Sequence, residues 1–470
     1  MELGCDRAHS KGRNIHGDDG ALYATHTEPE PIVATSRTLE QTRRRGVIAA
    51  AVGTIVEYYD LTVYAYLAVV VSPLFFPGDD PTASLLKSLA VFASAYLMRP
   101  IGGIFFGRLG DRHGRKRALL ISVLLMGVGS ALMAFLPTYE SAGVLAPILL
   151  VIARLVQGFS AGGELGGALT YVYETVGEKR KGLGASFVAL GSNSGFALAA
   201  IAVATTSAFT SDAQMTNWGW RIPFLLGVPL VLFCLWTRSR IEDTPEFERA
   251  ANDNKLAKAP LGDLLRTHPK QVLQVFGLGV AQNATGYMVL TYIGIHLVRE
   301  GGYSQTAVTW TAALVIVLVA LSMPIAGLFV DKFGSIRVLI TGLLASAILA
   351  YPAMVMMGDH GLFVAAIAFA FFAFGTPLIQ TATAPLFPSL FDARVRLTGV
   401  ALGFNVATIA TGGTAAYIAT WLIDRTGNSV SPAYFVVGSC IVGLVTVATI
   451  RTKTYSGSRA ERREAASVGN

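Results

Sequence analysis

The sequence predicts an all-α membrane protein with twelve transmembrane helices in two pseudo-symmetric six-helix bundles. Composition is the first observation: 53% of the 470 residues are hydrophobic and only 14% are charged, whereas soluble domains carry about 25% charged residues. The second is a series of long apolar runs separated by short polar segments. The third is a motif that occurs twice at one constant offset, because a duplicated motif between apolar runs indicates two halves of one architecture.

Twelve apolar runs are long enough to cross a bilayer, which takes about 20 helical residues. They cover residues 46–73, 86–107, 118–136, 143–174, 185–208, 219–238, 271–298, 306–330, 336–358, 361–386, 397–423 and 431–450. The basic residues test this count, since Lys and Arg concentrate on the cytoplasmic side of a membrane. With both termini placed in the cytoplasm, only Lys87, Arg221, Arg299 and Arg425 fall at the outer ends of helices. The alternation therefore favours twelve helices and two cytoplasmic termini.

The same pattern divides the chain into five parts. We expect a disordered cytoplasmic tail at residues 1–45, an N-terminal six-helix bundle at 46–238, a cytoplasmic linker loop at 239–270, a C-terminal six-helix bundle at 271–450 and a cytoplasmic tail at 451–470. Polar composition and a position in the middle of the chain are typical of a linker between two halves.

The duplicated motif is a cationic turn between two apolar runs. Its shared residues are Gly107, Asp111, Gly114 and Arg117 in the first copy and Gly327, Asp331, Gly334 and Arg337 in the second. Glycine permits a tight turn and close approach. An aspartate can cap a helix N-terminus or pair with an arginine such as Arg115. A basic loop alone is a common topology signal, but the repeated spacing favours a structural latch between the halves.

Five ionisable residues stand out away from the ends of the apolar runs: Glu57, Asp60, Arg99, Arg154 and Glu164. A charge at the bilayer centre costs at least about 2.5–3.5 kcal/mol on insertion scales, so such residues usually face the bundle interior or a water-filled cavity. Glu57 and Asp60 share one helix face with Tyr64, because the three recur at i, i+3 and i+7.

Two interpretations of these charges are open. Asp60, Glu57 and Glu164 are candidates for proton coupling, because burial disfavours an ionised carboxylate, a nearby arginine favours it, and an arriving solute can shift that balance. Arg99 and Arg154 are candidates for gripping a substrate carboxylate with the guanidinium fork. The alternative is a set of permanent buried ion pairs that only hold helices together. For Glu164, flanking glycines make packing or gating an equal alternative.

Uncharged polar residues supply further candidates for substrate contact. They are Tyr64 in the first half and Gln282, Asn283, Tyr287, Tyr292, Gln380 and Asn405 in the second. Amides and tyrosines in membrane helices more often hydrogen-bond between helices, so both roles stay open. Gly412 and Gly413 are expected to let the eleventh helix flex.

These motifs resemble a known family. The cationic turn and its copy resemble the paired loops of the major facilitator superfamily, and more specific segments resemble its metabolite–proton symporters. Those segments are Glu57 to Asp60, Met98 to Pro100, Arg154 to Glu164, Trp218 to Phe224 and Glu242 to Pro245. The likeness covers roughly residues 46–450. The branch usually has Trp at Tyr58, Phe at Leu61 and an aromatic residue at Leu165, and these departures bear on the solute rather than on the family.

The resemblance implies proton-coupled import of a small organic acid or zwitterion by alternating access around a central cavity. Di- or tricarboxylates, shikimate-like acids, betaine and proline are the implied solutes, and the buried arginines favour one with a carboxylate. Export by antiport is the alternative, although the Gly-x-x-x-Gly-Pro signature usual in such exporters lacks its proline in Gly191 to Phe196. A transporter-like sensor or a membrane-embedded enzyme is a further alternative. No nucleophile–base set supports an enzyme.

The expected partners are a small solute, protons and the lipid bilayer of a bacterial inner or plasma membrane, with the chain acting as a monomer. Nucleic acid is not expected despite the +7 charge, because the basic residues are spread over short loops. We expect no cofactor and no metal site, since the chain has neither a P-loop nor a His-Glu-x-x-His motif. Cys5, Cys234 and Cys440 lie far apart, so no disulfide is expected.

Overall fold

Long helices joined by short turns form almost the whole of the described chain. The computed structural model describes residues 36–78, 81–240, 260–358 and 360–450, and no β-strand occurs within those ranges. Ten of the described helices are long and apolar enough to cross a membrane. The predicted seventh span is present in three consecutive helical sections, and the predicted twelfth is a shorter apolar helix. The prediction of an all-α, twelve-helix membrane fold is therefore confirmed.

The first half contains six long helices and several short ones. They are α1 (Ser36–Phe75), α2 (Pro81–His113), α3 (Arg115–Ala134), α4 (Tyr139–Ala142), α5 (Leu145–Thr175), the 3-10 turn η1 (Glu178–Arg180), α6 (Lys181–Phe209), α7 (Asp212–Gln214), the π-helical η2 (Met215–Gly219) and α8 (Arg221–Ser239). Helix α1 begins before residue 46, so the last part of the expected N-terminal tail is helical. The rest of that tail, residues 1–35, lies outside the described residues.

The second half repeats this order with more interruptions. It consists of α10 (Pro260–Thr267), α11 (Pro269–Tyr287), the π-helical η3 (Met288–Tyr292), α12 (Ile293–Arg299), α13 (Gln305–Phe333), α14 (Ser335–Met356), α15 (Leu362–Ala373), α16 (Gly375–Ser389), α17 (Arg396–Thr411), α18 (Ala415–Thr426) and α19 (Pro432–Ala448). The described end of the expected linker is the helix α10. The remainder of the linker, residues 241–259, and the C-terminal tail at 451–470 lie outside the described residues.

Small residues bring the helices of the first half into close contact. Gly158 and Gly162 lie one turn apart on α5 and face α2. A Cβ on Gly158 would come within 2.6 Å of the Ala95 carbonyl carbon, and a Cβ on Gly162 within 2.6 Å of the Gly103 nitrogen. Small residues spaced by four are the usual means by which membrane helices approach each other closely. Because the two helices approach so closely, the side chains that flank these glycines are buried between α2 and α5.

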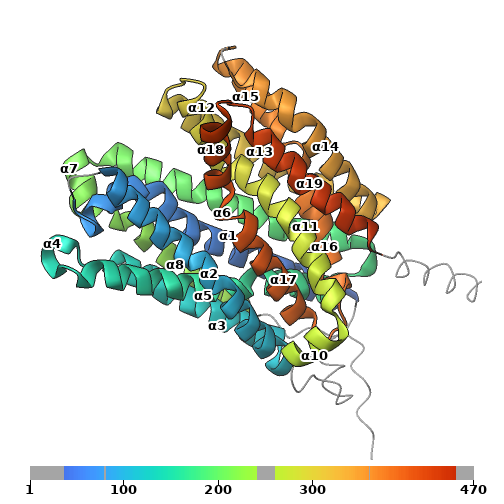
Figure 1. The fold of residues 1–470 in the computed structure, drawn as a ribbon. Coiled ribbons are helices and arrows are strands. Elements are labelled where there is room, and N and C mark those ends of the chain that lie inside the picture. Colours follow the sequence, from blue (N-terminus) through green and yellow to red (C-terminus); the bar gives the residue numbers. More distant parts are fainter. Residues whose placement is uncertain (1–35, 79–80, 241–259, 359, 451–470) are drawn as a thin grey trace, which may run out of the picture. The chain divides into compact units, whose positions relative to one another are not determined.

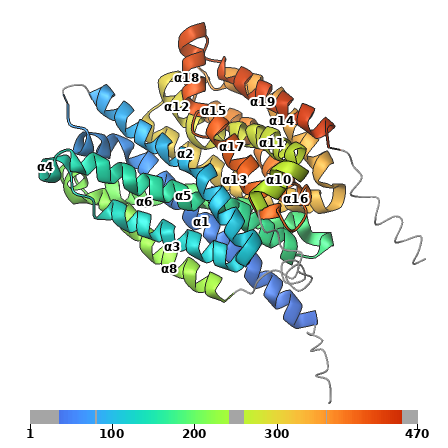
Figure 2. The ribbon, with the colours of Figure 1, turned by 60° about the horizontal axis from the view of Figure 1, so that its bottom comes forward.

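Residues from Gln41 onward form one compact unit, and the two halves lie side by side within it. Figures 1 and 2 show the blue-to-green helices of the first half grouped apart from the yellow-to-red helices of the second. Helix α2 packs along α17, and α6 packs along α13. Both pairs join one half to the other. Side chains on these four helices can therefore form the contacts that hold the two halves together.

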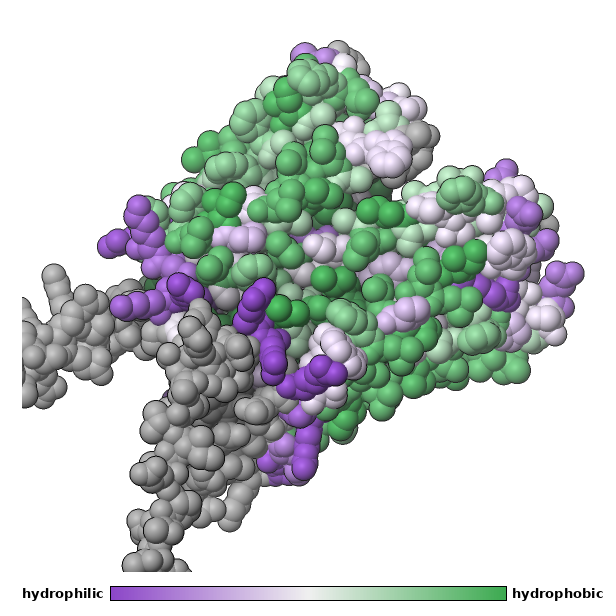
Figure 3. Space-filling view, turned by 180° about the vertical axis from the view of Figure 1, so that it is seen from behind, coloured by the Kyte–Doolittle hydropathy of each residue, from purple (hydrophilic) through white to green (hydrophobic). Residues whose placement is uncertain are grey.

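The outer surface of this unit is suited to lipid. Figure 3 shows hydrophobic side chains over the sides of both lobes, with hydrophilic ones gathered towards opposite ends. Exposed large apolar residues include Leu314, Leu321 and Leu328 on α13, spaced at seven residues along one helix face. The same view shows a notch between the two lobes.

Candidate functional site

Glu57 and Arg99 form a fully buried ion pair between α1 and α2. Arg99 Nη2 donates to Glu57 Oε1 at 2.7 Å, and the two side chains are 1% and 0% exposed. Arg99 Nε also donates to Asn405 Oδ1 of α17 at 3.3 Å. Asn405 in turn donates to the Gly162 carbonyl at 2.6 Å. The predicted substrate-binding residues Arg99 and Asn405 therefore meet at the boundary between the halves.

This ion pair leaves hydrogen-bonding capacity unused. Arg99 Nη1 and Glu57 Oε2 are buried and have no hydrogen-bond partner. A buried charged group with an unmade hydrogen bond is costly, by about 1–3 kcal/mol or more. A further acceptor could therefore bind to Arg99 Nη1, and a further donor to Glu57 Oε2.

Asp60 lies one turn further along α1 and contacts two uncharged donors. Ser130 Oγ donates to Asp60 Oδ1, and Gln157 Nε2 donates to Asp60 Oδ2 at 2.7 Å. Arg154 Nη1 donates to Gln157 Oε1 at 2.8 Å. Gln157 thus stands between the carboxylate and the guanidinium, so its amide joins Asp60 to Arg154, where the alternative of permanent buried ion pairs implied a direct contact between charges.

The other contacts of Arg154 are to α1 and to aromatic rings. Its guanidinium carbon lies 4.1 Å from the ring centroid of Tyr64 and 5.4 Å from that of Phe92. Arg154 Nη2 also reaches the Leu61 carbonyl at 3.5 Å. Tyr64 OH bonds with Ser88, at 2.8 Å from its Oγ. These contacts hold Arg154 and Tyr64 inside the first half rather than at the boundary between the halves.

Glu164 is already satisfied by a partner that sequence reasoning did not find. Arg238, at the end of α8, donates to both carboxylate oxygens of Glu164, and Ser122 Oγ adds a third donor at 3.1 Å. Arg238 is 0% exposed, although its sequence position suggested a charge at a loop end. A carboxylate held by a two-pronged arginine and a hydroxyl is a packing element, so this geometry favours the packing interpretation of Glu164.

An internal cavity lies between the halves and is lined largely by aromatic and amide side chains. It is bounded by Tyr58, Ser192, Asn193, Phe196, Gln282, Asn283, Tyr287, Gln380, Thr383 and Phe404, together with aliphatic residues and Gly286. Ring centroids lie 5.3 Å apart for Tyr58 and Phe196 and 6.4 Å apart for Phe196 and Tyr287. Of the predicted substrate-binding residues, Asn283, Tyr287 and Gln380 line this cavity, whereas Tyr64, Arg99, Arg154 and Asn405 do not.

Arg99 lies one aromatic ring behind the lining of the central cavity. Its guanidinium carbon is 5.9 Å from the ring centroid of Tyr96, and the Tyr96 and Tyr287 hydroxyls are 3.5 Å apart. Asn193 donates to Gln380 across the halves at 3.0 Å. The guanidinium of Arg99 is therefore separated from the cavity by Tyr96, whose hydroxyl lies beside that of the cavity-lining Tyr287.

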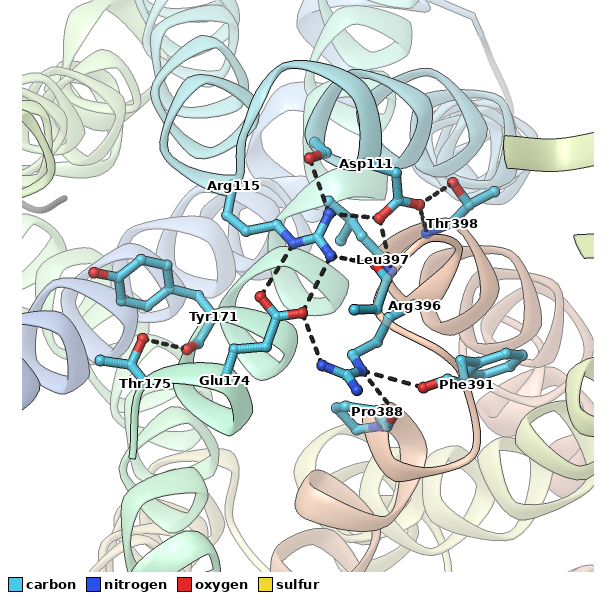
Figure 4. Close-up of polar contacts among 12 residues, drawn as sticks. Asp111, Arg115, Tyr171, Glu174, Thr175, Pro388, Phe391, Arg396, Leu397 and Thr398 are labelled. Carbon is cyan, nitrogen blue, oxygen red and sulfur yellow. Dashed lines mark hydrogen bonds and ion pairs between the residues drawn. The ribbon is translucent and has the colours of Figure 1, made fainter. Parts of the chain in front are cut away.

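The first copy of the duplicated motif joins the halves at one end of the bundle, which we call the latch end (Figure 4). Asp111 accepts hydrogen bonds from the amides of Leu397 and Thr398 at 3.3 and 3.0 Å and from Thr398 Oγ1 at 2.6 Å. These amides lie in the first turn of α17, so the aspartate lies at the positive end of that helix. Arg115 pairs with the same aspartate at 2.5 Å.

Arg115 extends this network to a further acid and base. It donates to Glu174 of α5 at 3.1 and 3.3 Å and to the Ala393 carbonyl at 2.8 Å. Arg396 of α17 pairs with Glu174 at 2.9 Å. Figure 4 shows the four charged side chains directed towards one another. Sequence reasoning missed Glu174 and Arg396, because each is a single charge at the end of an apolar run.

The second copy makes the corresponding contact with the other half. Asp331 Oδ1 and Oδ2 accept from the amides of Gly182 and Leu183 at 2.6 and 3.0 Å, which are the first amides of α6. Gly114 and Gly334 have φ values of 103° and 88°, which supply the turns after α2 and α13.

Glycine also permits close approach at the latch end. A Cβ on Gly107 would lie 2.7 Å from Thr398 Cα, and a Cβ on Gly327 would lie 2.7 Å from Ser186 Cβ. Arg117 and Arg337 are exposed. The paired aspartates and glycines, rather than these two arginines, therefore make the contacts between the halves.

We expect Asp111→Asn to open the latch end. The change removes the charge that faces both Arg115 and the start of α17, and breaking a buried pair costs about 3–5 kcal/mol. Amide hydrogen exchange at Leu397 and Thr398 should accelerate, and solute uptake should fall at least about tenfold. Asp331→Asn is the matched control, with faster exchange expected at Gly182 and Leu183 instead. Unchanged protection at both helix ends would contradict the latch.

Comparisons with known proteins agree with this geometry. The family model described as "Sugar (and other) transporter" matches residues 46–271 and 248–456. The chain is 32% identical to the proline/betaine transporter of Escherichia coli K12 over 424 residues, covering 87% of this chain and 83% of that protein. The chain belongs to the major facilitator superfamily. This superfamily member falls in the metabolite–proton symporter branch and is a transporter rather than an enzyme.

Other relatives carry similar descriptions. A glycine betaine/proline/ectoine/pipecolic acid transporter of Dickeya dadantii, OusA, is 33% identical over 416 residues, covering 86% of this chain and 82% of that protein. A putative proline/betaine transporter of Staphylococcus haemolyticus is 33% identical over 422 residues, covering 89% and 90%.

Among solved structures, the proton:xylose symporter XylE bound to 6-bromo-6-deoxy-D-glucose has a TM-score of 0.73 at 16% identity, covering 87% of this chain and 95% of that one. The partially occluded inward-open form of XylE from E. coli has a TM-score of 0.63 at 17% identity, covering 86% and 98%. These structural likenesses support the superfamily fold.

Proposed function

We propose that this superfamily member imports a small zwitterion of the betaine or proline kind by proton symport. The observation that carries the proposal is the unpartnered Arg99 Nη1, buried behind a cavity lined by aromatic rings. A guanidinium suits the carboxylate of a zwitterion, and aromatic rings suit its ammonium head. The descriptions of the relatives as proline and betaine transporters support the same class of solute.

The aromatic side of the cavity suits the cationic head of the solute. The ring centroid of Phe196 lies within 6.4 Å of those of Tyr58 and Tyr287, and quaternary ammonium groups bind over such rings. None of the side chains that line this cavity in the described structure is charged, so the head meets no competing ammonium or guanidinium. Asn283 and Gln380 complete the lining with amide groups.

The arginine side suits the carboxylate of the solute. A guanidinium recognises a carboxylate through two parallel N–H donors, and Arg99 has one terminal nitrogen unused while the other holds Glu57. An arriving carboxylate competes with Glu57 for the same cation. Glu57 then loses part of the charge that keeps it ionised in a buried place, which favours uptake of a proton.

Asp60 is proposed as the principal proton site. It is buried, and the donors that contact it, Ser130 and Gln157, are uncharged. The nearby positive charge of Arg154 reaches the carboxylate only through the Gln157 amide. A protonated Asp60 needs only a rotation of the Ser130 hydroxyl to keep its hydrogen bonds. The proposed proton site, Asp60, therefore lies one helical turn along α1 from Glu57, the carboxylate that competes with the solute for Arg99.

Alternating access is assigned to the two bundles at residues 46–238 and 271–450, with the latch end facing the cytoplasm. The tails at 1–45 and 451–470 and the linker at 239–270 then lie on that side of a bacterial inner or plasma membrane, and the chain acts as a monomer. In the conformation described here the latch contacts are made, so we assign it to an outward-facing state. Opening requires Asp111 and Asp331 to leave the helix ends that they cap.

Uptake into proteoliposomes tests the proposal. With an inward proton gradient, glycine betaine and proline are expected to accumulate above their external concentration. An uncoupler that dissipates the gradient should abolish this accumulation. Dicarboxylates and shikimate are the comparison solutes, because they lack the cationic head. Solute efflux driven by the inward gradient would instead support antiport, and preferential uptake of a dicarboxylate would contradict the zwitterion assignment.

A further inference from the structure

A second pocket lies on the C-terminal half, away from the central cavity. It is enclosed by η3, α12 and α18, and its lining includes Tyr292, Tyr417 and Trp421 together with the carboxylates Glu300 and Asp424. Tyr417 and Trp421 are exposed, whereas Tyr292 is 2% exposed and forms the floor. Aromatic faces beside carboxylates are the chemistry that binds an organic cation.

A buried imidazole in the same lining has no partner of its own. His296 is 3% exposed, and its Nδ1 has no hydrogen-bond partner. Its ring centroid lies 5.9 Å from that of Tyr292. Arg299, at the end of α12, also lines the pocket. The pocket therefore offers both an acceptor set for a cation and polar nitrogen groups for a carboxylate.

The position of the pocket follows from the course of its helices. Helices α11 and α17 both start near the latch end and line the central cavity, α11 with Tyr287 and α17 with Phe404. Their continuations, α12 and α18, carry His296 and Trp421, which follow Tyr287 and Phe404 further along the chain. The pocket thus lies beyond the central cavity, at the end of the bundle remote from the latch.

The helix geometry between the two places differs from that of a regular α-helix. Residues Met288–Tyr292 are π-helical, and α17 ends at Thr411 while α18 begins at Ala415. π-Helical turns are frequent at functional sites. The π-helical section contributes to both linings, with Leu290 at the central cavity and Tyr292 at the second pocket, and the break at residues 412–414 precedes the part of α18 that lines the second pocket.

From this arrangement we propose that the second pocket is an outer docking site that takes the zwitterionic solute before it enters the central cavity. The ammonium head lies against Trp421 and Tyr417, with Asp424 and Glu300 compensating its charge. The carboxylate is directed to Arg299 and His296. The identity of the ligand class rests on the proposed function, but the existence of the site rests on this pocket alone.

The first test is binding to the full chain, purified in detergent and titrated with glycine betaine while tryptophan fluorescence is followed. Because Trp421 contacts the ammonium head, we expect a saturating change in the wild type that survives Arg99→Lys and disappears in Trp421→Phe. Trp310→Phe is the matched control, since Trp310 is also exposed on the C-terminal half, and it should keep the signal. A signal that persists in Trp421→Phe, or that disappears in Arg99→Lys, overturns the docking site.

The second test is uptake by the Trp421→Ala variant. Loss of one aromatic contact to a cation should raise KM about 3- to 10-fold and leave the maximal rate unchanged, with Trp421→Phe restoring most of the affinity. An unchanged KM in Trp421→Ala contradicts the docking role.

The results separate this inference from the proposed function. Arg99-dependent uptake without a fluorescence change from Trp421 contradicts the docking site but supports the proposed function. A saturating Trp421 signal without uptake does the reverse. If neither uptake nor a fluorescence change from Trp421 is observed, both the docking site and the proposed function are contradicted.

Discussion

Arg99→Lys is expected to lower the apparent affinity for glycine betaine or proline about 10- to 100-fold. A lysine can hold Glu57 as a single point charge, but it lacks the second planar donor that Arg99 presents through Nη1. A hydrogen bond to a charged group contributes about 1.5–3 kcal/mol, and about 1.4 kcal/mol corresponds to a tenfold change in affinity. Initial uptake rates over a range of solute concentrations measure the effect.

The control for Arg99→Lys is Arg337→Lys, because Arg337 is exposed at the start of α14. It makes the same chemical change without touching the cavity, and its uptake should match the wild type. Thermal unfolding of both variants shows whether Arg99→Lys remains folded. An Arg99→Lys protein that is folded and has wild-type affinity would show that Arg99 serves only the pair with Glu57.

Asp60→Asn is expected to abolish concentrative uptake while leaving solute exchange. An amide cannot carry a proton, but it retains the size of the carboxylate and can still accept from Ser130 or Gln157. The inward proton gradient should then no longer drive accumulation, a loss of about tenfold or more in the ratio of internal to external solute. Counterflow between labelled and unlabelled solute, which needs no gradient, measures whether the halves still alternate.

Glu140→Gln is the matched control for Asp60→Asn, since Glu140 is an exposed carboxylate on the short helix α4. Its accumulation should equal that of the wild type. If Asp60→Asn accumulates solute normally under a proton gradient, Asp60 is not the coupling group and Glu57 becomes the leading candidate. Loss of counterflow as well would indicate that Asp60 is needed for folding or alternation, rather than for coupling alone.

The helix count could be predicted from sequence because it depends on local quantities. A bilayer of about 30 Å requires about 20 apolar residues per helix, and charges at loop ends orient the spans. Interruptions were less visible. The eleventh span divides at Gly412–Thr414, where the glycine pair had suggested flexibility, whereas nothing in the apolar run 271–298 marks the π-helical section Met288–Tyr292.

The buried charges illustrate where sequence reasoning stopped. It placed Glu57, Asp60, Arg99 and Arg154 in the membrane interior, and all four are at most 3% exposed. It left their pairing open, and the structure assigns Glu57 to Arg99 and places Gln157 between Asp60 and Arg154. Gln157 had a signal, since it lies three residues from Arg154 and therefore on the same helix face.

The amino-acid sequence was sufficient to predict the fold class, the duplication of the halves and the set of charges that must avoid lipid. Hydropathy, helical spacing and motif repetition are properties of neighbouring residues, so they survive without a structure. The tertiary structure was needed to show which charges meet, that Arg238 pairs with Glu164, and that Phe196 of α6 packs near Tyr287 of α11 at one cavity. Those contacts depend on how each helix is rotated about its axis and packed against distant segments, and a single sequence does not encode that rotation locally.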